Sequence, residues 1–257
     1  MARRSTTAPH RRKNREDAEL AGYARASKAP WQILCLLLPL IVVYEVGSLI
    51  YLTSPETDQV ATVEADRLLG AAFERFGVTG LHLPGVVVVV VLLVWHLLTR
   101  DSWRIRWTVL LGMVAESALW TFPLLVIAVL LDPTALAQGT DVRSWDLGAR
   151  ITISIGAGLY EELLFRMIII AAAHFALVDL LRVPERAGAI AAVAISAVLF
   201  GWYHLPAGMG FDLGWFLFYC AAGAYFGVVY LLRDFGIVVA THAIYDLIVL
   251  VLLAGGS

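Results

Sequence analysis

Long apolar stretches alternate with short polar ones along almost the whole chain after residue 30. About 20 consecutive apolar residues are needed to span the hydrocarbon core of a bilayer as a helix. Seven stretches approach or reach that length, at residues 31–52, 83–99, 107–131, 149–175, 187–204, 212–232 and 236–254. We therefore predict an all-α fold, a polytopic transmembrane helix bundle of about seven spans.

The segment at residues 54–78 follows a different pattern. Its apolar side chains recur at helical spacing among charged ones, which is typical of an amphipathic helix lying in the membrane interface. Residues 1–29 are polar and hold eight Lys and Arg residues. We expect residues 1–29 to be a flexible basic tail and residues 30–148 to be helices that complete the bundle. The remaining helical core is then residues 149–254.

Composition supports the membrane assignment, with 60% hydrophobic residues, 16% charged residues and a mean hydropathy of +0.79. Soluble domains have about 45–50% apolar and about 25% charged residues. With the N-terminus inside, the inner regions carry 14 Lys and Arg and the outer regions carry 4. Basic residues favour the cytoplasmic side, so we expect a cytoplasmic N-terminus. Two lysines against seventeen arginines favour a prokaryotic plasma membrane.

Three polar clusters interrupt the last four apolar stretches: "EELLFR" at 161–166, "FGWYH" at 200–204 and "HAIYD" at 242–246. Charged groups at membrane depth are costly and usually mark a function. Glu162 and Arg166 stand four residues apart, so they share a helix face and can pair. Glu161 is rotated by about 100° from Glu162 and faces a different neighbour.

Taken singly, each cluster has an ordinary structural explanation. A Glu–Arg pair can hold helices together, and a histidine at a helix end is often interfacial. The small residues Gly223 and Gly227 favour close helix packing within the bundle over dimerisation. Glu45 and Glu116 are more typical of structural hydrogen bonding than of cavity lining.

Taken together, the motifs E-E-x-x-x-R, F-x-x-x-H and H-x-x-x-D, in this order on late spans, resemble the CPBP family of intramembrane proteases. This family includes the CAAX prenyl endopeptidases and bacteriocin-processing or immunity homologues. The resemblance covers about residues 149–250, and it implies an intramembrane endopeptidase that hydrolyses a peptide bond of a membrane-associated substrate.

The resemblance also implies a role for each matching residue. Glu161 would activate water, and His204 would help to hold it. His242 would polarise the scissile carbonyl or steady its oxyanion, with Asp246 beside it. The supporting residues would be Glu162, Arg166 and Phe200.

Two points stay open in the sequence. Zinc ligation by Glu161, His204 and His242 is as compatible with these residue types as a metal-free glutamate mechanism, so the cofactor is unknown. The family often has Asn where this chain has Asp246. Because an ionised Asp246 would repel an oxyanion, it must be protonated, orient His242 or bind a metal.

Two other function classes fit parts of the pattern: a non-catalytic membrane scaffold or immunity-type protein of the same fold, and an ion or proton carrier. The expected partners are the lipid bilayer and a peptide or protein substrate, with or without lipid modification. We expect no nucleic-acid partner, and the sequence does not indicate an oligomeric state. Simple depth counting also places His204 and His242 far apart along the membrane normal, which a tilted or broken helix would have to correct.

Overall fold

The computed structural model describes residues 18–53, 63–75, 77, 83–131, 145–205 and 210–253. Within these ranges the chain is helical, without a β-sheet. The helices are α2 (Pro30–Tyr51), α3 (Glu64–Glu74), α4 (Leu83–Thr99), α5 (Trp107–Leu131), α6 (Leu147–Gly156), α7 (Ala171–His174), α8 (Glu185–Tyr203), α9 (Leu213–Arg233) and α10 (Phe235–Asp246). Segments of wider π-helix continue α6, α7 and α10: η3 (Ala157–Glu161) and η4 (Leu163–Ile170) follow α6, η5 (Phe175–Leu180) follows α7, and η6 (Leu247–Leu253) follows α10.

The predicted membrane bundle is confirmed. In the described part of the chain, six helices are long and apolar enough to cross a membrane, and Pro84–Thr99 is a shorter apolar helix. Helices are favoured here because hydrocarbon offers no partner to backbone N–H and C=O groups, and a helix satisfies them internally. The long helix Leu147–Leu180 has 34 residues. At 1.5 Å per residue it extends about 50 Å, further than the ~30 Å hydrocarbon core.

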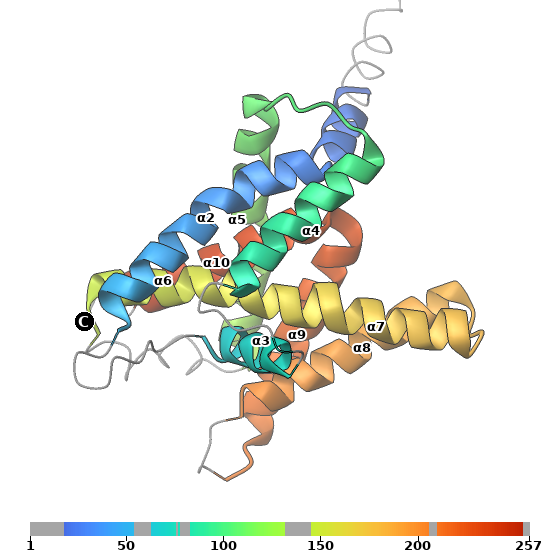
Figure 1. The fold of residues 1–257 in the computed structure, drawn as a ribbon. Helices are drawn as coiled ribbons and strands as arrows, with labels where there is room; N and C mark the ends of the chain where they lie inside the picture. Colours follow the sequence, from blue (N-terminus) through green and yellow to red (C-terminus); the bar gives the residue numbers. More distant parts are fainter. Residues whose placement is uncertain are drawn as a thin grey trace, which may run out of the picture.

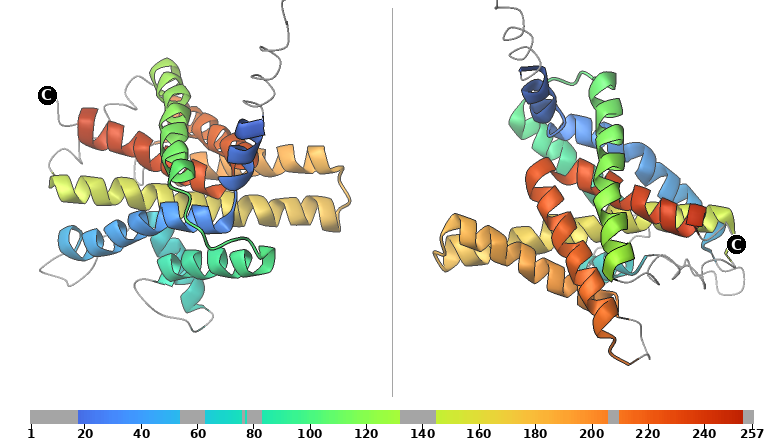
Figure 2. Two further views of the ribbon diagram at one scale, coloured as in Figure 1. Left: turned by 90° about the horizontal axis from the view of Figure 1, so that it is seen from above. Right: turned by 180° about the vertical axis from the view of Figure 1, so that it is seen from behind.

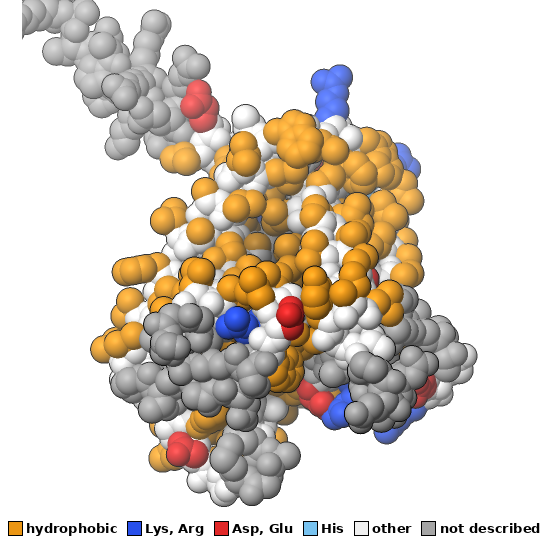
Figure 3. All heavy atoms as spheres, turned by 90° about the vertical axis from the view of Figure 1, so that its left-hand side faces the viewer, with side chains coloured by type: hydrophobic (Ala, Val, Ile, Leu, Met, Phe, Trp, Pro, Cys, Tyr) orange, Lys and Arg blue, Asp and Glu red, His pale blue; other side chains and the backbone are white. Residues whose placement is uncertain are grey.

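The outer surface has the character expected of a protein in lipid. Large hydrophobic side chains are exposed on several helices, including Val42, Val46 and Ile50 of α2 and Val90 and Val94 of α4. Figure 3 shows one face of the molecule on which hydrophobic side chains predominate and charged ones are few. A soluble protein rarely exposes such a continuous apolar surface.

The helices cross steeply instead of forming a parallel bundle (Figures 1 and 2). α2 and α4 lie side by side, and the long helix Leu147–Leu180 returns along α8 as a projecting hairpin. α5 crosses α10, which lies in the middle of the molecule (Figure 2). The central position of α10 matches its burial, since ten of its twelve residues are buried.

Glycines permit the closest helix contacts. A Cβ atom at Gly223 of α9 would lie 3.0 Å from Cα of Ala197, and one at Gly227 would lie 2.8 Å from Val193 Cγ1. Both neighbours belong to α8. The two glycines therefore serve packing within the bundle, as the sequence pattern indicated.

Two polar segments differ from the expectation. Residues 18–26 form a helix, although the sequence placed them in a flexible tail; residues 1–17 lie outside the described residues. Tyr23 of this helix donates a hydrogen bond to Glu116 of α5 at 2.7 Å, and the same carboxylate pairs with Arg233. These contacts attach the 18–26 helix to the bundle, which composition alone did not indicate.

The predicted amphipathic helix is present as the shorter α3, and residues 54–62 are outside the described part of the chain.

Candidate active site

A cavity of about 310 Å³ lies where the long helix, α9 and α10 meet. All four residues that the resemblance identifies as catalytic line it, together with mostly apolar side chains. The lining comprises Leu124, Ile153, Ala157, Glu161, Phe200, His204, Trp215, Phe218, Tyr219, Ala222, Phe226, His242, Tyr245, Asp246, Val249 and Leu250.

The glutamate pair lies on the widened part of the long helix. Glu161 ends η3, and Glu162 separates η3 from η4. Such π-segments occur often at functional sites because they shift the direction of side chains on a helix. Here they direct Glu161 into the cavity, while Glu162 is fully buried beside it.

Arg166 neutralises Glu162, as the four-residue spacing predicted. Its Nη1 lies 3.0 Å from Glu162 Oε1, and both side chains are fully buried. Nη2 donates to the Gly223 carbonyl at 3.2 Å, and the guanidinium lies over the rings of Phe200 at 4.5 Å and Phe226 at 5.1 Å. Phe200 thus supports Arg166 from its aromatic face, a cation–π arrangement.

His242 reaches the same carboxylate from α10. Its Nδ1 lies 2.7 Å from Glu162 Oε1. A Cβ atom at Gly158 would lie 2.8 Å from the Ala243 backbone nitrogen and 2.9 Å from the Val239 carbonyl oxygen. Because Gly158 has no side chain, the backbone of α10 can lie directly against the backbone of the long helix. This close approach places His242 next to the two glutamates.

His204 enters from the C-terminal end of α8. Its Nδ1 lies 2.9 Å from the Phe200 carbonyl oxygen, which can only accept a hydrogen bond, so Nδ1 carries a proton. The ring stacks on Tyr219 at 4.0 Å and 10°, and Trp215 donates its indole N–H to the His204 carbonyl at 2.8 Å. In the neutral imidazole the second nitrogen, Nε2, is then an unprotonated acceptor.

The two histidines, predicted to lie at different depths, face the same oxygen. Glu161 Oε2 is 3.6 Å from His204 Nε2 and 3.9 Å from His242 Nε2. The steep crossing of the helices brings them together. Glu161 Oε2 is buried and accepts no hydrogen bond within the described residues.

Asp246 lies near the same nitrogen of His242 as Glu161 does. Its Oδ2 is 3.6 Å from His242 Nε2, which is too long for a direct hydrogen bond. His242 Nε2 therefore lies within 4 Å of two carboxyl groups, those of Glu161 and Asp246, while its Nδ1 contacts Glu162.

Aromatic residues that the sequence pattern did not single out complete the site. Tyr203 donates to Glu161 Oε1 at 3.3 Å, and Phe226 stacks on His242 at 4.5 Å. Tyr219 and Phe226 stand seven residues apart on α9 and so share one face. Tyr203 is adjacent to His204 in "FGWYH", so its position next to a predicted site residue was the available signal.

The zinc alternative does not fit this geometry well. Within the described residues, no group of three His, Cys, Asp or Glu is arranged to hold a metal ion. The separations of 3.6 and 3.9 Å from Glu161 Oε2 to the two Nε2 atoms exceed the ~3.3 Å between neighbouring ligand atoms that zinc bond lengths near 2.0 Å imply for a tetrahedral site. We therefore derive no step through a metal.

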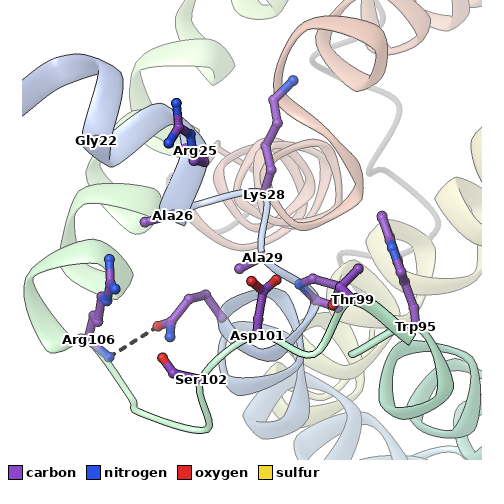
Figure 4. Close-up of a pocket in the computed structure, with 12 residues that line it drawn as sticks. Gly22, Arg25, Ala26, Lys28, Ala29, Trp95, Thr99, Asp101, Ser102 and Arg106 are labelled. Carbon is purple, nitrogen blue, oxygen red and sulfur yellow. Dashed lines mark hydrogen bonds between the residues drawn. The ribbon is translucent and has the colours of Figure 1, made fainter. Parts of the chain in front are cut away.

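A second cavity, of about 270 Å³, lies between the 18–26 helix, the start of α2 and the loop that joins α4 to α5. Figure 4 shows Arg25, Lys28 and Arg106 around it and Asp101 pointing toward it, with a hydrogen bond from the Arg106 backbone to Gln32. Arg25, Asp101 and Arg106 are exposed. This cavity lacks a buried acid–base group, so the glutamate–histidine cavity is the candidate active site.

Residues 143–248 match the family model described as type II CAAX prenyl endopeptidase Rce1-like. The match includes all seven residues of the predicted site and confirms the resemblance to the CPBP and CAAX proteases. No curated protein and no solved structure matches the chain.

Proposed function

From the match of residues 143–248 to the CAAX prenyl endopeptidases, we propose that this membrane protein is an intramembrane endopeptidase. Its substrate would be a membrane-associated peptide or protein, cleaved by water that Glu161 activates. The observation that carries this proposal is the approach of two histidine nitrogens to one buried carboxylate oxygen, Glu161 Oε2.

Glu161 and His204 have the arrangement needed to hold and deprotonate water. Because Nδ1–H of His204 donates to the Phe200 carbonyl, Nε2 of His204 is an acceptor. It lies 3.6 Å from a second acceptor, Glu161 Oε2. A water molecule can satisfy both because it has two protons to donate. Its oxygen lone pairs are then free to attack the scissile carbonyl carbon as a proton passes to Glu161.

His242 is suited to stabilise the negative charge that develops on the carbonyl oxygen of the substrate. Its Nδ1–H donates to Glu162, so a carboxylate supports the ring when it is protonated. Nε2–H of that imidazolium can donate to the carbonyl oxygen as it becomes negative, which stabilises the transition state. Asp246, within 3.6 Å of Nε2, would act there as a neutral hydrogen-bonding group.

The second half of the reaction returns the proton. When the tetrahedral intermediate collapses, the carbon–nitrogen bond breaks and protonated Glu161 donates to the departing amine. The products are a new carboxyl terminus, formed with the oxygen of water, and a new amino terminus. Glu162, Arg166 and Phe200 take no proton in this scheme, and their role is to hold His242 and the helix.

A cleavage assay on the purified protein in lipid tests the proposal. Membrane-associated reporter peptides, with and without a prenyl group, should be cleaved by the wild type, and Glu161→Gln should abolish cleavage. Glu45→Gln is the matched control, since Glu45 is also a carboxylate that accepts a tyrosine hydrogen bond, from Tyr160 at 2.7 Å. Cleavage by Glu161→Gln at the wild-type rate would refute the glutamate mechanism.

A chelator separates the two cofactor alternatives. The metal-free scheme predicts unchanged cleavage after treatment with a strong zinc chelator. Loss of activity that added Zn²⁺ restores would instead assign Glu161, His204 and His242 as metal ligands.

A further inference from the structure

α3 packs against η3, the segment of the long helix that ends at Glu161, and the first turn of α3 is partly buried there. Val63, Ala65 and Asp66 are buried, while Arg67 and Leu68 in the next turn are exposed. The first N–H groups of a helix have no partner within the helix, and the N-cap residue Val63 has no side-chain hydrogen bond to offer them. These N–H groups are open to partners from elsewhere in the bundle or to water.

Two tyrosine hydroxyls occupy this position. The hydroxyl of Tyr44 on α2 lies near the backbone N–H of Val63, and that of Tyr203 on α8 lies near the backbone N–H of Ala65. Each hydroxyl also donates its own proton to a carboxylate. Tyr44 donates to Asp66 at 3.1 Å, and Tyr203 donates to Glu161 at 3.3 Å.

The second of these connections ends on the catalytic carboxylate. Tyr203 engages Glu161 Oε1, which leaves Oε2 as the oxygen that faces His204 and His242. The Tyr203 ring makes edge contacts with the rings of Phe165 at 5.3 Å and His204 at 4.8 Å, measured between ring centroids. A hydrogen bond to one oxygen fixes the rotation of the carboxylate group. The other oxygen then already points toward its reaction partners, so the group need not reorient during the reaction.

We propose that Tyr203 is a positioning residue for Glu161, and that the N-terminus of α3 holds Tyr203 in place. This inference rests on the proposed protease function and adds to it. α3 lies outside residues 143–248, the region that matches the protease family. A helix of the N-terminal half would thus contribute to the catalytic geometry through one tyrosine hydroxyl.

The direct test is Tyr203→Phe, which removes the hydroxyl and keeps the ring. We expect kcat to fall about 10- to 100-fold, the usual effect of losing a hydrogen bond to a charged group. KM should stay unchanged, because Tyr203 does not line the cavity that receives the substrate. Tyr160→Phe is the matched control: Tyr160 precedes Glu161 on the same helix and donates to a different glutamate, Glu45. Its kcat should stay within about twofold of wild type.

A double-variant comparison tests the part played by α3. Tyr44→Phe removes the hydrogen bond from Tyr44 to Asp66 of α3 and so weakens the attachment of α3, without changing Tyr203 or Glu161. It should lower kcat less than Tyr203→Phe does. If α3 acts through Tyr203, the double variant Tyr44→Phe/Tyr203→Phe should be no slower than Tyr203→Phe alone.

The outcomes are distinguishable. A wild-type kcat for Tyr203→Phe, together with an inactive Glu161→Gln, would overturn the positioning role and leave the protease function standing. Additive losses in the double variant would overturn the role of α3. An active Glu161→Gln would instead refute the proposed function itself. Thermal unfolding measures how much of each variant is folded. Cleavage rates are then expressed per folded protein, so that misfolding is not mistaken for a loss of catalysis.

Discussion

One carboxylate oxygen, Oε1 of Glu162, lies 2.7 Å from Nδ1 of His242 and 3.0 Å from Nη1 of Arg166. The sequence indicated the pairing with Arg166 but not the contact with His242. Glu162 therefore both neutralises a buried arginine and orients a proposed catalytic histidine.

Glu162→Gln should reduce both stability and activity. Arg166 would remain fully buried without its counter-charge, and breaking a buried ion pair typically costs about 3–5 kcal/mol. His242 would also lose the carboxylate that supports its protonated form. Thermal unfolding and cleavage rate at equal folded concentration measure the two effects separately. A variant that is destabilised but cleaves normally would contradict the role assigned to His242.

Asp246 is the position at which this chain departs from the commoner pattern. If Asp246 is a neutral hydrogen-bonding group, Asp246→Asn should retain most activity, because an amide has nearly the same shape and can both donate and accept. Asp246→Ala should lose activity. The comparison is the cleavage rate of both variants across pH. Equal loss in Asn and Ala would favour a charged role or a metal ligand instead.

Gly158→Ala should separate α10 from the long helix. The added Cβ would meet backbone atoms of Val239 and Ala243 at 2.8–2.9 Å, so the helix must shift. We expect destabilisation by about 1–3 kcal/mol. Cleavage should fall about 10- to 100-fold, because His242 moves with α10.

Gly70→Ala is the control for the glycine experiment. Gly70 lies inside α3, and no heavy atom lies within 4 Å of an added Cβ. Alanine there should stabilise the protein by about 0.5–1 kcal/mol and leave cleavage unchanged. A wild-type rate for Gly158→Ala would show that the approach of α10 does not set the catalytic geometry.

The two chain ends should lie on opposite sides of the membrane. Six helices have the length of a span, and α4 as a seventh makes the number odd. The bias of basic residues predicts that the N-terminus is cytoplasmic. Reporter fusions at Ala29 and Ser257 measure the side of each end. The same side for both would mean an even number of crossings and would contradict the seven-span topology.

The sequence by itself determined the membrane helices of this fold. Each of the seven predicted apolar stretches is a helix, and six of them meet the length and composition of a span. This is predictable because hydrocarbon excludes unpaired backbone groups, so apolar length directly implies a helix. The pairing of Glu162 with Arg166 was equally predictable, because the helical repeat places residues four apart on one face.

Only the tertiary structure decided how the site is assembled. His204 and His242 seemed to lie at different depths because depth counting assumes helices parallel to the membrane normal. The steep crossing of the helices, with the close approach of α10 at Gly158, brings both histidines within 4 Å of Glu161. The contact of Tyr203 with the N-terminus of α3 depends on packing between segments more than 130 residues apart. A helical repeat relates neighbours along one helix, whereas crossing angles depend on side chains from both partners, so no local pattern reveals them.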